Sequence, residues 1–401
     1  MYQLSRRSFL LGAAVIAVRS AGEDTAEDLL LHPQAKVAEL ERSRVQRAAK
    51  SYLNVKPETI VSIPAKRSAG GLHDYYSEAD YWWPDPKNPN GPYIRRDGES
   101  NPENFNAHRE LLIRLSIQMP ALAAAWILTR RRDFAAHAEA HLRAWFVERA
   151  TRMNANLKYA QAIHGLDTGR SIGIIDTVHL VEVAQAALIL ERGGVLGDGV
   201  WKGTREWFAE YLNWLTTSAP GREERDAKNN HGSCWVLQAA GFARLTGDSG
   251  VIAACRERLK KELFPGQIAA DGSFPLELAR TKPYSYSLFN LDVLGMCAEI
   301  LSDETENLWS YGLSDGRHLE QCFRFMVPFI ANKQAWPYRH DVEYFDDLPV
   351  RQPSLLFAGL AYRELKYIDV WQLLNPDPSV PEIIRNHPIR QPFLWLRQDR
   401  A

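Results

Sequence analysis

Cysteine is scarce in this sequence. The 401 residues contain four cysteines, Cys234, Cys255, Cys297 and Cys322, and none forms a CxxC pair or a Cys/His cluster with the spacing of metal ligands. This excludes a cysteine-based metal centre. Each cysteine falls within an apolar helical pattern, so we expect buried thiols. An oxidising compartment would permit a disulfide, but a chain of this length buries a large core without one.

Long hydrophobic runs and an excess of charge of one sign are also lacking. No segment approaches the roughly 18 consecutive apolar residues that a membrane-spanning helix needs. The sequence has 48 basic and 49 acidic residues, which gives a formal net charge of −1. Such a surface provides no overall field to hold nucleic acid or an anionic membrane. We therefore expect neither as a partner, and any polyanion must be bound by a local basic cleft.

The N-terminal residues have the form of a twin-arginine export signal. The run Ser5-Arg6-Arg7-Ser8-Phe9-Leu10 is followed by a short apolar segment, residues 13–18, and then by small residues near Ser20. Paired arginines before such a segment are typical of this leader. We expect residues 1–21 to be a signal peptide and residues 22–401 to form a single domain of an exported bacterial protein, periplasmic or secreted. A basic N-terminal helix of a cytoplasmic protein is the weaker alternative.

After the leader, apolar residues recur at three- and four-residue spacing, which predicts one helix after another. The clearest segments are residues 107–129, 133–148, 173–193, 201–217, 231–246, 249–263, 288–302, 314–331 and 353–366. Sustained two-residue alternation is absent, so we expect an all-α fold with at most short strands in loops. About ten successive helices with short connections favour helical hairpins arranged as a solenoid or a closed α/α toroid. The absence of a repeat of fixed period argues against a TPR or ankyrin array.

Three long loops, residues 71–106, 152–172 and 271–290, are rich in aromatic and polar residues. Loops of this length in a compact domain are usually functional or disordered, and the aromatic content argues against disorder. Aromatic rings pack on the apolar faces of sugars, while amides and guanidinium groups bind hydroxyls and carboxylates. The loops therefore favour a carbohydrate site. A nucleic-acid-binding protein would mix the same residue types, but export and the balanced charge count against it.

The stretch Asn229-Asn230-His231 lies where an apolar helix is predicted to begin. The first amides of a helix are unpaired and carry the positive end of its dipole, so a carboxylate placed there is stabilised. The amide and imidazole side chains also suit an anion. The alternative is an asparagine cap beside a structural histidine. We expect Asn229 to be the cap.

Several of these motifs together resemble the alginate-lyase-type polysaccharide lyases, in the branch that includes lyases of alginate and of β-1,4-glucuronan. They are Tyr76-Ser77-Glu78 through Tyr81-Trp82-Trp83-Pro84, the segment 92–98, the pair Asn230-His231, and Arg280 with Tyr286. The resemblance covers residues 70–300. It implies an α/α toroid or incomplete barrel of about six to seven helical hairpins, whose aromatic-rich loops form a cleft. It also implies an acidic polysaccharide substrate and no obligatory metal or other cofactor, and it leaves the oligomeric state open.

The resemblance assigns roles to individual residues. The catalytic residues of the family fall on Asn230, His231, Arg280 and Tyr286, with Tyr284 as the alternative tyrosine because it lies two residues earlier. The residues expected to bind substrate are Tyr76, Trp82, Trp83, Arg95, Arg96, Tyr159, Gln161, His164, Arg170, Lys282 and Tyr284. Glu277 is expected to orient Arg280 or His231, because it lies close to Arg280 in the sequence.

A lyase of this type cuts a uronic acid polymer by β-elimination. A base removes the proton at C5, beside the carboxylate, and the glycosidic oxygen leaves C4. Because the carboxylate is ionised, it must first be neutralised, and Asn230, His231 and Arg280 supply an amide, an imidazole and a guanidinium donor. Tyr286 is then base and acid, provided that nearby positive charge from Arg280 or Lys282 lowers its pKa from about 10.

The configuration of the sugar decides where base and acid must lie. In β-1,4-linked mannuronate or glucuronate, H5 and O4 lie on the same side of the breaking bond, so one tyrosine reaches both. Guluronate has the inverted C5 and requires base and acid on opposite faces. For that sugar, His231 would be the base and Tyr286 the acid.

Two other functions remain open on the sequence. A glycoside hydrolase on the same kind of toroid needs two carboxylates at a set separation. Candidates are Asp85, Asp97, Glu99 and Glu277, but nothing in the sequence pairs them. A non-catalytic periplasmic glycan-binding protein could use the same aromatic loops without any chemistry.

Overall fold

The computed structural model describes residues 28–396. The predicted signal peptide, residues 1–21, lies outside the described residues. The helices are α2 (Pro33–Tyr52), α3 (Ala107–Thr129), α4 (Arg132–Leu142), α5 (Leu180–Arg192), α6 (Asp198–Thr217), α7 (Ala219–Arg225), α8 (Asn230–Thr246), α9 (Ser249–Arg258), α10 (Phe264–Gln267), α11 (Pro275–Leu278), α12 (Pro283–Leu301), α13 (Leu319–Ala331), α14 (Pro353–Tyr362), α15 (Leu365–Leu373) and α16 (Pro381–Arg385).

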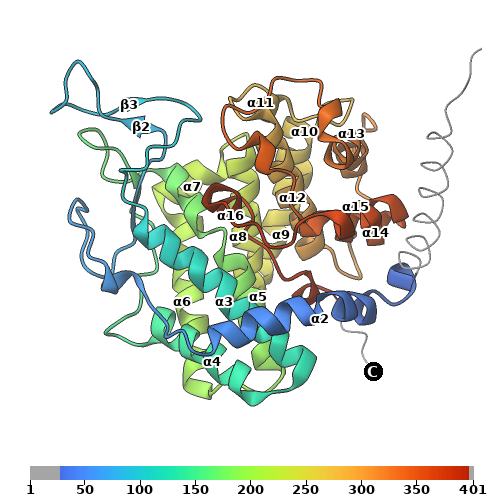
Figure 1. Ribbon diagram of the computed structural model, residues 1–401, viewed down its shortest axis with the longest axis horizontal. Coiled ribbons are helices and arrows are strands. Elements are labelled where there is room, and N and C mark those ends of the chain that lie inside the picture. The colour runs from blue at the N-terminus through green and yellow to red at the C-terminus, as the bar shows by residue number, and fades with distance from the viewer. Residues whose placement is uncertain (1–27, 397–401) are drawn as a thin grey trace, which may run out of the picture.

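The long helices form an inner and an outer layer (Figure 1). In the inner layer, α3, α5, α8, α12 and α14 contact one another in that order. Outer helices pack on them: α2 and α4 on α3, α6 and α9 on α8, α13 on α12, and α15 on α14. Nearly every residue of α5, α8 and α12 is buried, as expected for helices that are apolar on all faces. The predicted all-α fold and α/α toroid are confirmed.

Four short strands lie in the loops between the helices. β1 (Tyr76–Glu78) pairs in parallel with β4 (Tyr159–Ala162), and β2 (Trp82–Trp83) pairs antiparallel with β3 (Ile94–Arg95). β1 belongs to the loop 71–106 and β4 to the loop 152–172, so backbone pairing joins the first two aromatic loops. The β2–β3 hairpin projects beyond the helical body (Figure 1).

The start of α12 differs from the prediction in a way that bears on function. The helix begins at Pro283, well before the predicted start at residue 288. Proline suits the first position of a helix, and the Asp341 carboxylate accepts hydrogen bonds from the backbone amides of Tyr284 and Ser285. Tyr286 therefore projects from the first turns of a capped helix and not from a loop.

The expectation that no segment could span a membrane is wrong for α3. In the described chain, α3 is long and apolar enough to do so by length and composition. However, 78% of its most apolar window is buried inside the protein, where α3 packs against α2, α4 and α5. This burial is typical of the core helix of a helical domain.

The C-terminal strap, residues 386–396, is fixed to both α5 and α2. The buried carboxylate of Glu182 on α5 accepts hydrogen bonds from the backbone amides of Arg390 (2.9 and 3.0 Å) and Gln391 (2.7 Å). Arg44 of α2 donates to the carbonyl oxygen of Arg390 at 3.1 Å. The strap thus connects the first and the last parts of the described chain.

We expect Glu182→Ala to lower the free energy of unfolding by about 3 kcal/mol, because it leaves two buried backbone amides without acceptors. Urea denaturation followed by circular dichroism measures this change. The control is Glu191→Ala, at a less buried position of the same helix, which is expected to change the free energy by less than about 0.5 kcal/mol. Equal effects of the two substitutions would show that Glu182 does not hold the strap.

Candidate active site

A cavity of about 300 Å³ opens at the N-terminal ends of α8 and α12. It is lined by Asn230 and His231 from α8, by Tyr286 from α12 and by Arg280 from the segment between α11 and α12. The aromatic loops add Tyr81, Trp82, Arg95, Gln161 and Arg170, and the C-terminal part of the chain adds Arg385 and Asn386. The fold therefore brings all four predicted catalytic residues to one cavity.

The first amides of α8 are already hydrogen-bonded. Asn229 is the cap, as predicted, and its side-chain oxygen accepts from the backbone amide of His231 at 3.4 Å. The backbone amide of Asn230 donates to Glu277 at 2.8 Å, and that of Gly232 donates to the carbonyl oxygen of Asn229. The carboxylate expected at this helix start is that of Glu277 itself, so these amides are not left for a substrate anion. Any anion in the cavity must be bound by side chains.

Glu277 holds Asn230, not Arg280 or His231 as we expected. Its carboxylate accepts from the Asn230 side-chain amide at 2.7 Å as well as from the Asn230 backbone. Both side chains are buried. Because the Glu277 carboxylate accepts, the Asn230 atom that faces it is the side-chain nitrogen Nδ2 and not the oxygen. The second hydrogen on Nδ2 remains for another acceptor.

His231 pairs with Glu224, a residue of α7 that the sequence analysis did not single out. Its Nδ1 atom lies 2.7 Å from Glu224 Oε1, and the Glu224 side chain is buried. An ionised carboxylate only accepts, so Nδ1 carries the proton. Burial lowers the pKa of the His231 imidazole, but the charge of Glu224, its hydrogen bond and the charge of Glu277 together raise it, so the pKa lies above its ordinary value.

Arg280 lies directly beside the Tyr286 phenol. The guanidinium carbon is 4.4 Å from the ring centroid, and Nη2 donates to the Tyr286 hydroxyl at 3.3 Å. The same nitrogen contacts Asp97 at 3.3 Å, which keeps the guanidinium in place. Amide, imidazole, guanidinium and phenol groups therefore surround a common space.

The pKa of Tyr286 differs from the expectation. Burial raises the pKa of its phenol, whereas Arg280 and the hydrogen bond from Tyr81 lower it, and burial has the larger effect. The pKa therefore lies above its ordinary value in the free protein. Lys282 lies outside the lining of the cavity, where it is buried and pairs with Glu343 at 3.0 Å.

Two tyrosines near Tyr286 differ in their contacts: Tyr81 reaches the Tyr286 hydroxyl, and Tyr284 lies in the core. The Tyr81 hydroxyl lies 2.9 Å from the Tyr286 hydroxyl, a contact that the sequence analysis missed although Tyr81 stands within the aromatic motif. Tyr284 is buried in the core and donates to the carbonyl oxygen of Phe329 at 3.0 Å. Of the two candidate tyrosines, the one that lines the cavity is Tyr286.

The predicted substrate-binding residues divide into two groups. Trp82, Arg95, Gln161 and Arg170 line the cavity. Arg170 donates to the backbone and side-chain oxygens of Gln161, and its guanidinium lies 6.0 Å from the Trp82 ring centroid. The backbone of Gln161 has a φ of 49°, in the left-handed region that favours glycine.

The other predicted substrate-binding residues lie outside the lining of the cavity. These are Tyr76, Trp83, Arg96, Tyr159, His164, Lys282 and Tyr284. Tyr76 is buried with its hydroxyl bonded to Glu78 at 2.8 Å. Trp83 and Arg96 pack on each other in the β2–β3 hairpin, with the guanidinium 5.0 Å from the ring centroid. Tyr76, Lys282 and Tyr284 thus have structural contacts, whereas the hairpin pair remains at the surface.

A comparison with protein families decides the classification. Residues 61–336, more than half of the chain, match the family model for alginate lyase. The chain belongs to the alginate lyase family. This confirms the resemblance to alginate-lyase-type polysaccharide lyases. No curated protein matches the chain.

Solved structures of alginate lyases have the same fold as this family member. An alginate lyase from Bacteroides ovatus is 28% identical and has a TM-score of 0.78; the similarity covers 92% of this chain and 97% of that chain. Alginate lyase A1-III from Sphingomonas species A1 is 15% identical, with a TM-score of 0.54 and coverage of 88% of this chain and 95% of that chain. A His-to-Ala variant of A1-III, complexed with a tetrasaccharide, is 14% identical with a TM-score of 0.56, and 88% of this chain and 94% of that chain are covered.

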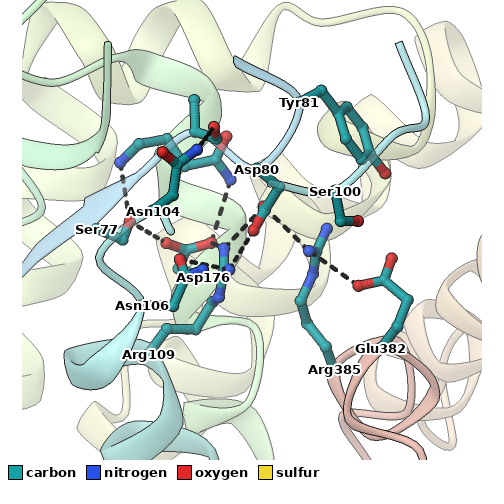
Figure 2. Close-up of polar contacts among 12 residues, drawn as sticks. Ser77, Asp80, Tyr81, Ser100, Asn104, Asn106, Arg109, Asp176, Glu382 and Arg385 are labelled. Atoms are coloured by element: carbon teal, nitrogen blue, oxygen red, sulfur yellow. Dashed lines mark hydrogen bonds and ion pairs between the residues drawn. The ribbon is translucent and has the colours of Figure 1, made fainter. Parts of the chain in front are cut away.

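In this alginate lyase family member, a buried ion network holds Arg385 in the lining of the cavity. Figure 2 shows Asp80 between Arg109 and Arg385, and Arg109 also contacts Asp176. Arg385 Nη1 lies 3.0 Å from Asp80 and 3.1 Å from Glu382 of its own helix α16. Burial raises the pKa of the Asp80 carboxyl, but the two arginines lower it to about 2. Asp80 is therefore ionised at neutral pH and holds Arg385 at the cavity.

Proposed function

We propose that this polysaccharide lyase cleaves a β-1,4-linked polyuronate, either the polymannuronate of alginate or glucuronan, by β-elimination. The observation that carries the proposal is that Asn230, His231, Arg280 and Tyr286 line one cavity, in which Arg280 contacts the Tyr286 hydroxyl. These three side chains are the donors that an ionised carboxylate requires. The cationic and aromatic residues beside them suit further sugars of an acidic chain.

The first task in the proposed mechanism is to neutralise the uronate carboxylate. Arg280 offers a planar guanidinium, Asn230 an amide hydrogen and His231 the ring nitrogen that does not face Glu224. All three are held by carboxylates before substrate binds, so little reorganisation is needed as negative charge develops beside C5. Preorganised donors of this kind contribute roughly 3–4 kcal/mol each to the transition state.

The second task is proton transfer by Tyr286. The phenol first releases its proton to solvent. The phenolate then takes H5, the electrons of the C5–H bond form the C4=C5 double bond, and the bond between C4 and O4 breaks. O4 then takes the proton from Tyr286, which restores the phenolate. The raised pKa makes the phenolate, once formed beside Arg280, a strong base. The hydrogen bond to Tyr81 helps to hold the oxygen in place.

The cavity offers little support for a glycoside hydrolase. Among the described residues that line it, Asp80 is the only carboxylate, and it is occupied by Arg109 and Arg385. The candidates Asp97 and Glu277 are tied to Arg280 and Asn230. A hydrolase needs one carboxyl group as acid and a second as base or nucleophile. The available carboxylates hold other residues and do not form such a pair.

A substrate panel tests the proposal. Purified protein is incubated with polymannuronate, glucuronan and polyguluronate, and the ultraviolet absorbance of the new double bond is followed. We expect a signal with polymannuronate or glucuronan and little with polyguluronate, because one phenol serves only the geometry in which H5 and O4 share a side. Folded protein that produces no double bond from any of the three polymers would refute the proposal, and new reducing ends without absorbance would indicate hydrolysis.

A further inference from the structure

Glu224 stands behind His231 in a position that determines the charge of the imidazole. The Glu224 side chain is only 1% exposed, and its Oε1 atom lies 2.7 Å from His231 Nδ1. Its other oxygen, Oε2, is buried without a hydrogen-bond partner in the described structure. A buried, ionised carboxylate with an unpaired oxygen lowers the stability of the folded protein unless a nearby cation compensates its charge. Among the described residues, His231 is the only ion-pair partner of Glu224.

We propose that Glu224 is a positioning residue that keeps His231 protonated as a cationic donor to the uronate carboxylate. The proposal rests on the proposed function and assigns substrate binding and proton removal to two different residues. An imidazolium has no free lone pair and cannot accept the C5 proton. His231 would then bind the substrate, and proton removal would fall to Tyr286.

The charged groups around His231 favour this assignment. Glu224 of α7 and Glu277 of α11 face the imidazole and raise its pKa, whereas Arg280 lowers it. Burial acts against protonation, but the two carboxylates outweigh burial and Arg280 together. Among the described residues, the Tyr211 phenol of α6 and the Cys234 thiol of α8 also interact with Glu224, and neither is a cation.

This charge state restricts the sugar that can be cleaved. Guluronate requires a base on the face opposite the acid, and His231 is the candidate for that base. While Glu224 holds it as an imidazolium, His231 cannot serve as that base. Cleavage is then confined to uronates in which H5 and O4 lie on the same side, which are mannuronate and glucuronate.

Binding to an inactive variant tests the charge state without interference from the chemistry. In Tyr286→Phe, the affinity for trimannuronate or triglucuronate is measured by calorimetry between about pH 5 and 8, where histidine titrates. We expect affinity to fall about tenfold as pH rises through the His231 pKa, because a hydrogen bond between two charged groups is lost. The His231 C2 proton, followed by NMR in the same protein, gives the midpoint independently.

Glu224→Gln in the Tyr286→Phe background removes the charge but keeps an oxygen that accepts from Nδ1. We expect both midpoints, for affinity and for the NMR signal, to move to lower pH. Glu224→Asp keeps the charge, so its midpoints should stay near those of the parent. Affinity that is independent of pH, or a His231 pKa at or below its ordinary value in Tyr286→Phe, would overturn the proposal.

These outcomes are distinguishable from failure of the proposed function. If the wild-type protein forms no double bond and Tyr286→Phe binds no oligouronate at any pH, the function itself is wrong. If cleavage occurs but binding does not follow the His231 titration, only the role of Glu224 is wrong.

Discussion

Tyr286→Phe is expected to lower kcat/KM on the cleaved polyuronate by about 10³-fold, within the range typical of lost general acid–base catalysis. The substitution removes one oxygen atom and leaves the ring beside Arg280. Substrate affinity should therefore change little, because the carboxylate donors Asn230, His231 and Arg280 remain. The loss is measured from initial rates of double-bond formation, together with calorimetric binding of an oligouronate.

Tyr284→Phe is the matched control, since it removes the same atom from a tyrosine on the same turn of α12. The Tyr284 hydroxyl donates to the carbonyl oxygen of Phe329 in the core and does not reach the cavity. Its loss should reduce stability by about 1 kcal/mol and leave kcat/KM within a factor of a few. If Tyr284→Phe were inactive and Tyr286→Phe active, the assignment of the tyrosine would be reversed.

Arg280→Lys is expected to lower kcat/KM by about 10²-fold to 10³-fold, although the charge is kept. Lysine cannot provide two parallel hydrogen bonds to a carboxylate, and its ammonium group cannot stack on the Tyr286 ring in the same way. Since the donor acts mainly as negative charge develops, the loss should fall more on kcat than on KM. Steady-state rates over a range of polymer concentrations separate the two parameters.

Arg95→Lys serves as the control for this change. Arg95 also contacts Asp97, at 2.6 Å, but its side chain is 57% exposed at the edge of the cavity. An exposed pair of this kind contributes at most about 1 kcal/mol, so the effect should be less than tenfold and should fall on KM. A larger loss from Arg95→Lys than from Arg280→Lys would place the reacting carboxylate near the hairpin and away from Tyr286.

The elements best predicted from the sequence are those with strong local signals. The helix predicted at residues 107–129 coincides with α3, because an unbroken apolar pattern sets its length. The start of α12 was missed, because it depends on Asp341, a cap supplied from a distant part of the chain. Helix periodicity reports which face is buried, but it does not report a distant cap.

The same distinction applies to the site. Asn230, His231, Arg280 and Tyr286 were found because they stand in a recognisable pattern, and the fold brings them together. Their partners were not found, because each contact joins separate helices. Glu224 lies on α7 and was not considered, and Glu277 was assigned to the wrong neighbour. The raised pKa of Tyr286 was also missed, since burial depends on the whole fold.

The position of Arg385 has a consequence for the order in which the site can form during synthesis. Arg385 reaches Asp80 from the last part of the described chain, directly before the C-terminal strap that Glu182 fixes to α5. In a chain that still lacks these residues, the cavity has no Arg385 in its lining, and Asp80 has lost one of its two arginine partners. Because domains generally fold as units, the cavity cannot be complete before Arg385 and the strap have been synthesised.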